Sequence, residues 1–258
     1  MSFRLSIAQQ PLAWQDPEAN RAHFAGVLAP LAGNTDLVVL PEMFTTGFTM
    51  MPESHAEAAE GATRDWLQQQ AHALDAAVGG SVAVHEHGRY YNRFMLATPA
   101  GDFYHYDKRH LFRMGGEHRH YSAGSHAQLI EWRDLRICPL VCYDLRFPVW
   151  SRRRPELDYD LAIYSANWPA ARRHAWNTLL RARAIENQAF VTGVNRVGDD
   201  GNGIGHVGDS VVLDFTGQPL VELHDQPRVV TVPLDGAALR EWRDKFPAHL
   251  DADGFSLE

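Results

Sequence analysis

Cysteine is scarce in this sequence of 258 residues, which contains only Cys138 and Cys142. The two lie four positions apart in one strand-like segment, and four residues of extended strand span about 13 Å, too far for a disulfide between them. Proteins without disulfides are typical of reducing compartments. We therefore expect a cytoplasmic protein with at least one free thiol.

Long apolar runs are also missing. None approaches the roughly 20 residues that a membrane-spanning helix needs, so we expect no membrane partner. The first residues, Met1-Ser2-Phe3-Arg4, lead directly into a strand pattern, and we expect no signal peptide. Acidic and basic residues are interspersed, with a formal net charge of −8, which argues against a nucleic-acid partner.

Linkers, low-complexity tracts and internal repeats are absent as well. A chain of this length can bury a sizeable core. The sequence therefore predicts a single domain over residues 1–258.

Strand and helix patterns alternate along the first part of the chain, and hairpins interrupt the alternation repeatedly. Helices are expected from Asp16-Pro17 to about Gly33, and over residues 55–77, 172–187 and 239–246. Strands are expected at 3–9, 37–40, 82–84, 90–97, 127–132, 135–141, 161–164, 189–195, 206–215 and 229–232. The fold class is therefore mixed α/β.

Three chemically complementary residues each follow a strand-like run: Glu42, Lys108 and Cys142. Strand ends at one edge of a sheet are where separate segments bring functional groups together. A cysteine can attack a carbonyl or nitrile carbon while a carboxylate takes up its proton. An ammonium and the backbone N–H of Tyr143 can stabilise the resulting oxyanion. The alternative for a lone cysteine is a small buried apolar residue.

With these residues in this order, the sequence resembles the nitrilase superfamily of carbon–nitrogen hydrolases. The resemblance rests on Leu40-Pro41-Glu42-Met43-Phe44, on residues 106–112 around Lys108, on residues 141–148 around Cys142, and on residues 181–188 and 205–210. It implies that Glu42 is the general base, Lys108 the oxyanion stabiliser and Cys142 the nucleophile. It also implies an α-β-β-α sandwich, with two β-sheets flanked by helices, assembled as a homodimer through the helical layer after the nucleophile.

Glu117 is a fourth candidate, because the same resemblance implies a second glutamate seven residues before a pair such as Ala123-Gly124. Its implied role is to orient Lys108 or the substrate amide. The alternative is a loop carboxylate in solvent.

Within the superfamily, residues 108–114, residues 117–121 and the tail from Phe246-Pro247 to residues 251–253 are most similar to the omega-amidase branch. That branch releases ammonia from the terminal amide of 2-oxo dicarboxylic acid monoamides such as 2-oxoglutaramate. A nitrilase, an aliphatic amidase or an N-carbamoyl amidase remains an alternative. So does a non-catalytic binding protein on the same fold.

Four residues are candidates for contacts with a small-molecule amide substrate. Trp168, Arg172 and Arg173 follow the strand after the nucleophile, and an arginine fits a substrate carboxylate bidentately. The alternative is a surface pair of arginines at the start of a helix. Phe48, with Phe44, is expected to form an apolar wall beyond Glu42.

Histidine is plentiful, with 14 residues, yet no metal is expected. His85-Glu86-His87 and His118-Arg119-His120 lack a third ligand at zinc spacing. No histidine lies in a motif that selects it as partner of the thiol, so a Cys–His pair is the weaker alternative. The glycines at 198–205 lack the lysine of a phosphate-binding loop, and no cofactor is expected.

The two cysteines are expected to differ, since Cys142 lies at the strand end and Cys138 within the strand. If Glu42 and Lys108 flank Cys142, its thiol is expected to react below the ordinary thiol pKa of about 8.5.

Overall fold

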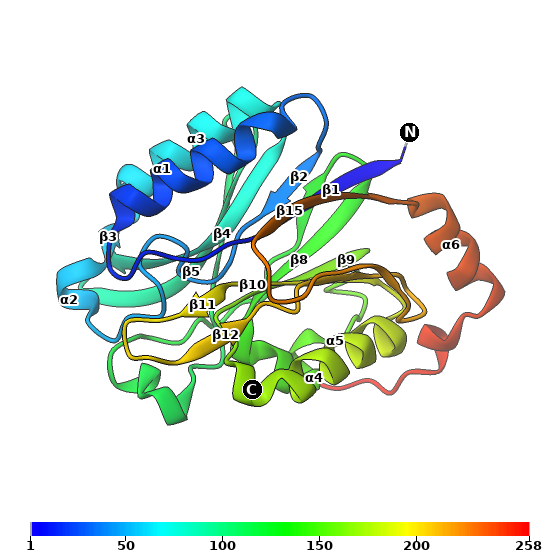
Figure 1. The fold of residues 1–258 in the computed structure, drawn as a ribbon. Helices are drawn as coiled ribbons and strands as arrows, with labels where there is room; N and C mark the ends of the chain where they lie inside the picture. The colour runs from blue at the N-terminus through cyan, green and yellow to red at the C-terminus, as the bar shows by residue number, and fades with distance from the viewer. Residues whose placement is uncertain (1, 258) are drawn as a thin grey trace.

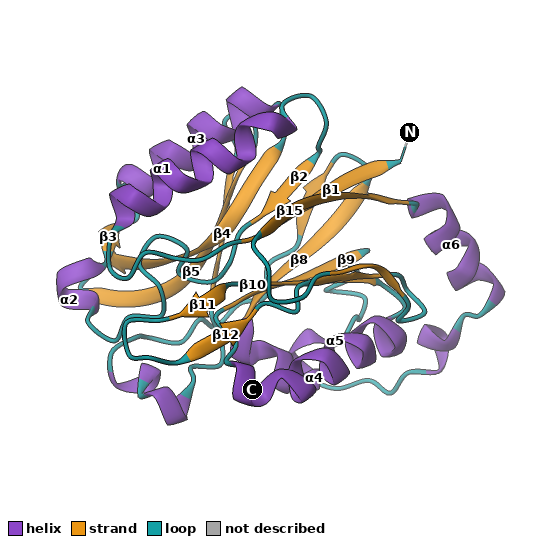
Figure 2. Cartoon of the chain, in the orientation of Figure 1, coloured by secondary structure: helices purple, strands orange, loops and turns teal. Residues whose placement is uncertain are grey.

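Two β-sheets packed face to face, with helices on both outer surfaces, make up the fold (Figures 1 and 2). The computed structural model describes residues 2–257. Its helices are α1 (Pro17–Leu28), α2 (Pro52–His55), α3 (Ala62–Leu74), α4 (Pro148–Ser151), α5 (Arg173–Asn187) and α6 (Gly236–Lys245). This is the sandwich that the resemblance implied. The prediction of one domain over 1–258 stays a prediction.

The first sheet has seven strands, in the order β15-β1-β2-β4-β5-β6, with β3 paired to β4. Their bounds are β1 (Phe3–Gln9), β2 (Leu37–Val39), β3 (Glu57–Ala58), β4 (Ala77–Glu86), β5 (Arg89–Ala97), β6 (Phe103–Asp107) and β15 (Arg228–Leu234). Helices α1 and α3 lie on its outer face (Figure 1).

The second sheet has six strands, in the order β14-β13-β10-β9-β8-β7. They are β7 (Ile130–Trp132), β8 (Leu135–Val141), β9 (Leu161–Ala166), β10 (Phe190–Asn195), β13 (Val211–Leu213) and β14 (Pro219–Glu222). Helices α4 and α5 lie on its outer face (Figure 2). A separate hairpin is formed by β11 (Val197–Asp199) and β12 (Gly205–Val207).

Strand β2 shows why the sheets stack in this way. Leu37 and Val39 pack into the core between the two sheets, whereas Val38 packs into the core beneath α1 and α3. All three are fully buried. An uninterrupted apolar run is what a strand covered on both faces requires.

The carboxyl ends of β2 and β9 are joined across the sandwich. The N–H of Glu42 donates to the carbonyl of Ala166 at 3.3 Å. The hydroxyl of Ser165 donates to the carbonyl of Leu40 at 2.7 Å. These bonds bring the ends of two strands from different sheets to one place, and the candidate site lies there.

Several expectations about secondary structure differ from the structure in detail. The helix expected at 55–77 begins only at Ala62 and ends at Leu74, and its expected last residue, Ala77, begins β4. The strand expected at 206–215 is broken between β12 and β13 at Gly208, which has a φ of +67°. Strand β14 was not expected, and its residues are mostly exposed.

The start of β4 was missed because Gly79 and Gly80 weaken a strand pattern. The structure shows why glycine is present. A Cβ on Gly80 would lie 2.7 Å from the Cβ of Leu40, and one on Gly79 would lie 2.9 Å from the carbonyl oxygen of Met95. Close packing on both faces of β4 requires these glycines.

Gly80→Ala is therefore expected to destabilise the fold by about 1–3 kcal/mol, the usual range for overpacking a core. Gly26→Ala is the matched control, because an added Cβ meets nothing within 4 Å there and alanine favours a helix by up to about 1 kcal/mol. Urea unfolding of both variants measures the difference. Equal stability would show that β4 tolerates a side chain at residue 80.

Candidate active site

Cys142 lies where β8 ends and a 3₁₀ helix, Cys142–Arg146, begins. Its φ is +44°, a left-handed conformation that is rare outside glycine and that clusters at functional sites. The N–H of Tyr143 lies in the first turn of this helix, where backbone N–H groups lack an acceptor within the helix. The strand end thus presents a thiol beside a backbone donor.

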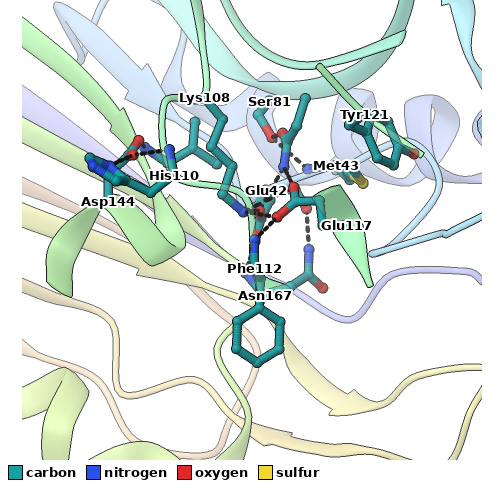
Figure 3. Close-up of polar contacts among 12 residues, drawn as sticks. Glu42, Met43, Ser81, Lys108, His110, Phe112, Glu117, Tyr121, Asp144 and Asn167 are labelled. Carbon is teal, nitrogen blue, oxygen red and sulfur yellow. Dashed lines mark hydrogen bonds and ion pairs between the residues drawn. The ribbon is translucent and has the colours of Figure 1, made fainter. Parts of the chain in front are cut away.

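Asp144 fixes this turn from within the protein. Its carboxylate is fully buried and accepts hydrogen bonds from the N–H of Val141 at 3.0 Å and the hydroxyl of Tyr106 at 2.8 Å. It also accepts from the N–H of His110 at 2.9 Å, and Figure 3 shows His110 and Asp144 together. Asp144 therefore ties the backbone just before Cys142, at Val141, to the segment that contains His110.

Glu42 follows β2 and is fully buried. Its Oε1 accepts from Lys108 Nζ at 2.8 Å, and its Oε2 accepts from the N–H of Asn167 at 2.8 Å. Its charge also acts on the thiol of Cys142. A carboxylate close to a thiol is positioned to take its proton.

Lys108 follows β6, and its ammonium is buried between two carboxylates, those of Glu42 and Glu117 (Figure 3). Nζ lies 2.8 Å from Glu42 Oε1, and 3.1 Å and 2.9 Å from the two oxygens of Glu117. Burial alone would lower the pKa of Lys108, but Glu117 and Glu42 raise it well above its usual value. The ammonium is therefore permanently charged.

Glu117 begins a one-turn 3₁₀ helix, Glu117–Arg119, and is fully buried, so it is not a solvated loop carboxylate. Besides Lys108, it accepts from the N–H of Phe112 at 2.5 Å. The predicted spacing to Gly124 has a physical reason. A Cβ on Gly124 would lie 2.0 Å from the carbonyl oxygen of Asp107, so the chain returns against the backbone beside Lys108.

The expectation of a low thiol pKa at Cys142 is wrong. Burial and the charge of Glu42 raise the pKa of the Cys142 thiol well above its usual value, and they outweigh the opposing effect of Lys108. The resting sulfur is thus a neutral thiol. Burial raises the pKa of Cys138 to about 12 as well, and that residue lies inside β8 with no carboxylate bonded to it among the described residues.

A pocket of about 200 Å³ opens onto Cys142. Phe48, Phe112 and Trp168 supply apolar walls, and Tyr143 and Lys108 also line it. The β11–β12 hairpin closes one side with four residues: Asp200, Asn202, Ile204 and His206. The pocket suits a small molecule with a mainly apolar middle.

Of the residues expected to contact substrate, Phe48, Trp168 and Arg172 line this pocket. Arg173 does not, because it points away and pairs with Asp209 at 2.8 Å. Phe44 does not either, since it packs against Phe24 and Trp66 beneath the helices. Of the two expected arginines, only Arg172 lines the pocket, and of the two expected phenylalanines, only Phe48 does.

Among the residues of the site that were not assigned from the sequence, three stand out by their contacts: Arg146, Asn167 and Asn92. Arg146 lines the pocket with its guanidinium 5.0 Å from the centre of the Trp168 ring. Asn167 follows β9, so the strand-end pattern that selected Glu42 would also have selected it. Asn92 lies inside β5 and donates to both glutamates at 2.7 and 2.9 Å, and no local sequence signal marks it.

Arg146 and Arg172 are the two arginines of the pocket wall. Neither forms an ion pair with a carboxylate among the described residues. Arg172 instead contacts Met114 Sδ and lies 5.4 Å from the centre of the Phe112 ring. Two guanidinium groups are therefore available to an anionic group of a ligand.

Asn167 holds Glu42 and leaves one acceptor unused. Its Nδ2 donates to the main-chain carbonyl of Glu42, which fixes the orientation of the amide. Its Oδ1 is buried and, within residues 2–257, has no hydrogen-bond partner. The residue lines the pocket, so a ligand N–H can supply the missing donor.

Within residues 2–257 there is no group of three or more His, Cys, Asp or Glu side chains arranged to hold a metal. No helix in the same range is both long and apolar enough to cross a membrane.

Comparison with known proteins decides the family. The model of the carbon–nitrogen hydrolase family matches residues 4–244. The chain belongs to the carbon–nitrogen hydrolases. Its fold is also that of XC1258 from Xanthomonas campestris, a CN-hydrolase superfamily protein with an arsenic adduct in its active site, with a TM-score of 0.98 and 50% identity over 100% of both chains.

Two curated relatives are amidases. The omega-amidase YafV of Yersinia enterocolitica is 50% identical over 99% of this chain and 99% of its own. The 2-oxoglutaramate amidase of Bacillus subtilis is 32% identical over 97% of this chain and 98% of its own. The chain is thus an amidase-type carbon–nitrogen hydrolase of the omega-amidase branch.

Replacing each cysteine in turn shows which of the two thiols the activity requires. Cys142→Ala is expected to abolish ammonia release from an amide substrate, because no other thiol lies at the pocket. Cys138→Ala is expected to keep most of the activity, since the residue is buried within β8. Comparable losses in both variants, at equal thermal stability, would contradict the assignment of Cys142.

Alkylation by iodoacetamide tests the raised pKa of Cys142. Because a raised pKa keeps the thiol protonated, its reaction rate is expected to keep rising above the ordinary thiol pKa of about 8.5. Peptide mass spectrometry across pH, with glutathione measured in parallel, gives the two profiles. A plateau for Cys142 at a lower pH than for glutathione would mean that Lys108 dominates over Glu42.

Proposed function

We propose that this chain hydrolyses the terminal amide of a small amide that bears a carboxylate, of the 2-oxoglutaramate type, and releases ammonia. The observation that carries the proposal is the pocket itself. Cys142 lies in it, and two arginines without carboxylate partners, Arg146 and Arg172, lie in its wall. A thiol and a guanidinium in one small pocket suit a substrate with an amide at one end and a carboxylate at the other.

The proposed first step forms a thioester. Glu42 takes the proton of Cys142, and the sulfur attacks the amide carbon. The N–H of Tyr143 and the ammonium of Lys108 stabilise the oxyanion. Glu42 then returns its proton to the nitrogen, the C–N bond breaks and ammonia leaves.

The second step regenerates the thiol. Glu42 takes a proton from water, the hydroxide attacks the thioester carbon, and the C–S bond breaks. The acid leaves and the sulfur regains a proton. Glu117 accepts hydrogen bonds from Lys108, and we assign it the role of orienting this ammonium.

Asn167 is the proposed contact for the substrate amide. Its unpartnered Oδ1 accepts a hydrogen bond from the amide N–H₂ group. A nitrile has no such donor and would leave the buried acceptor without a partner, which is unfavourable. This favours amide over nitrile hydrolysis.

We also propose a cytoplasmic homodimer that associates through α4 and α5. Val149 and Ile185 on these helices are large apolar residues that are 55% and 57% exposed. Exposed apolar side chains on adjacent helices suit a contact with a second copy. Sedimentation of the wild type and of a Val149→Asp, Ile185→Asp double variant tests this association.

Succinamate and butyramide have similar lengths and differ in the far carboxylate. The kcat/KM for succinamate is expected to exceed that for butyramide by at least tenfold, because a guanidinium facing a neutral group loses its charge-assisted hydrogen bonds. Arg172→Ala is expected to reduce this ratio, and Arg173→Ala, which removes a guanidinium paired with Asp209, to leave it unchanged. Equal kcat/KM for both substrates in the wild type would point instead to a general aliphatic amidase.

N-carbamoyl amino acids and nitriles complete the substrate panel, with ammonia as the readout. Turnover of either class above succinamate would favour the N-carbamoyl amidase or nitrilase alternative. A binding protein would show two results together. It would turn over no substrate class, yet an amide would slow the alkylation of Cys142.

A further inference from the structure

Asn92 lies in the middle of β5 and contacts three of the four residues proposed to carry the reaction. Its carbonyl accepts the N–H of Lys108 at 2.9 Å. Its Nδ2 donates to Oε1 of Glu42 at 2.7 Å and to Oε1 of Glu117 at 2.9 Å. The side chain is fully buried and does not line the pocket. It therefore acts on the site without reaching the substrate.

The orientation of this amide is fixed by a chain of donors. The N–H of Met43 donates to Ser81 Oγ at 2.8 Å, so the Ser81 hydroxyl has its own proton free to donate. That proton goes to Oδ1 of Asn92 at 2.7 Å. Both protons of Nδ2 consequently face the two glutamates. Figure 3 shows Met43 and Ser81 next to Glu42.

The two carboxylates share the same two nitrogens. Lys108 Nζ also donates to both Oε1 atoms, at 2.8 Å for Glu42 and 3.1 Å for Glu117. Two nitrogens and two oxygens thus alternate in a closed ring. One ammonium faces two carboxylates, so Lys108 alone leaves an excess negative charge in a buried place. The Asn92 amide supplies the second set of donors that fixes the two carboxylates relative to each other.

We propose that Asn92 is a positioning residue for this reaction, which holds the carboxylates of Glu42 and Glu117 at fixed positions around Lys108. The inference rests on the proposed function, since it assigns Asn92 a role in that chemistry. Burial raises the pKa of Glu117 above its usual value and the charge of Glu42 adds to the rise, while Lys108 and the Asn92 hydrogen bond oppose it. Besides Lys108, the titratable groups close to Glu42 and Glu117 are Cys142 and Tyr121.

Asn92→Ala is expected to lower kcat on succinamate by ten- to a hundredfold, the scale of losing a hydrogen bond to a charged group. KM is expected to change little, because residue 92 does not line the pocket. Asn92→Asp keeps the shape of the side chain but replaces its donors by a third carboxyl group. It is expected to lose kcat as well, whereas a packing role alone predicts that Asp retains nearly full activity.

A second readout does not depend on the substrate. The ¹³C NMR titration of labelled glutamate carboxyl groups, with Glu117 assigned by Glu117→Gln, gives the midpoint of Glu117 directly. Removing a donor from a carboxylate raises its pKa, so this midpoint is expected to move up by about one pH unit in Asn92→Ala. The wild type's failure to hydrolyse omega-amides would contradict the proposed function but leave this titration interpretable.

The matched control is Asn187→Ala. Asn187 is a buried residue of α5, and both ends of its side-chain amide bond the backbone. Its Nδ2 donates to the carbonyl of Arg183, and its Oδ1 accepts from the N–H of Arg153, each at 2.9 Å. It is expected to lose stability without moving the Glu117 midpoint. If Asn92→Ala does not fold, Ser81→Ala is expected to shift the midpoint in the same direction by less. An unmoved Glu117 midpoint in the folded variant, or a fully active Asn92→Asp, would overturn the proposal.

Discussion

The buried ammonium of Lys108 lies between the carboxylates of Glu42 and Glu117, and the hydrogen bonds of this cluster join segments from both sheets. Removing one charge from water costs several kcal/mol even after relaxation, so such a cluster persists only if hydrogen bonds satisfy its members. Here the donors come from several elements: Asn92 in β5, the N–H of Asn167 after β9 and the N–H of Phe112 after β6. The sandwich and the site are therefore stabilised by the same contacts.

The position of Cys142 follows from this cluster. Two hydrogen bonds join Glu42 to the end of β9 in the opposite sheet. The N–H of Glu42 donates to the carbonyl of Ala166, and the N–H of Asn167 donates to the carboxylate of Glu42. Since β8 and β9 run parallel and adjacent, the end of β8 brings the thiol to the same place. The positive φ of Cys142 then turns the chain into the 3₁₀ helix. A neutral thiol beside a carboxylate is an arrangement suited to proton transfer at the moment of attack.

The sequence predicted the residues that follow strands, because a strand end can be recognised locally. Glu42, Lys108 and Cys142 were found in this way, whereas buried Glu117 was indicated only by the resemblance to the nitrilase superfamily. Asn92 could not be found, since one polar residue inside a strand looks the same whether it faces solvent or a charge cluster. Arg172 and Arg173 were indistinguishable for a similar reason: only the position of Asp209 decides which of them faces the pocket. The fold class was predictable, whereas the start of β4 depended on packing around Gly79 and Gly80 that no local pattern contains.

The most direct test is acid-quench mass spectrometry of the protein mixed with excess succinamate. If Cys142 is the nucleophile in a cluster that transfers its proton to Glu42, a succinyl group is expected on the peptide that carries residue 142. Its amount is expected to rise to a steady level before the bulk of the acid product appears. A succinyl group on another residue, or steady ammonia release by Cys142→Ala, would contradict the account.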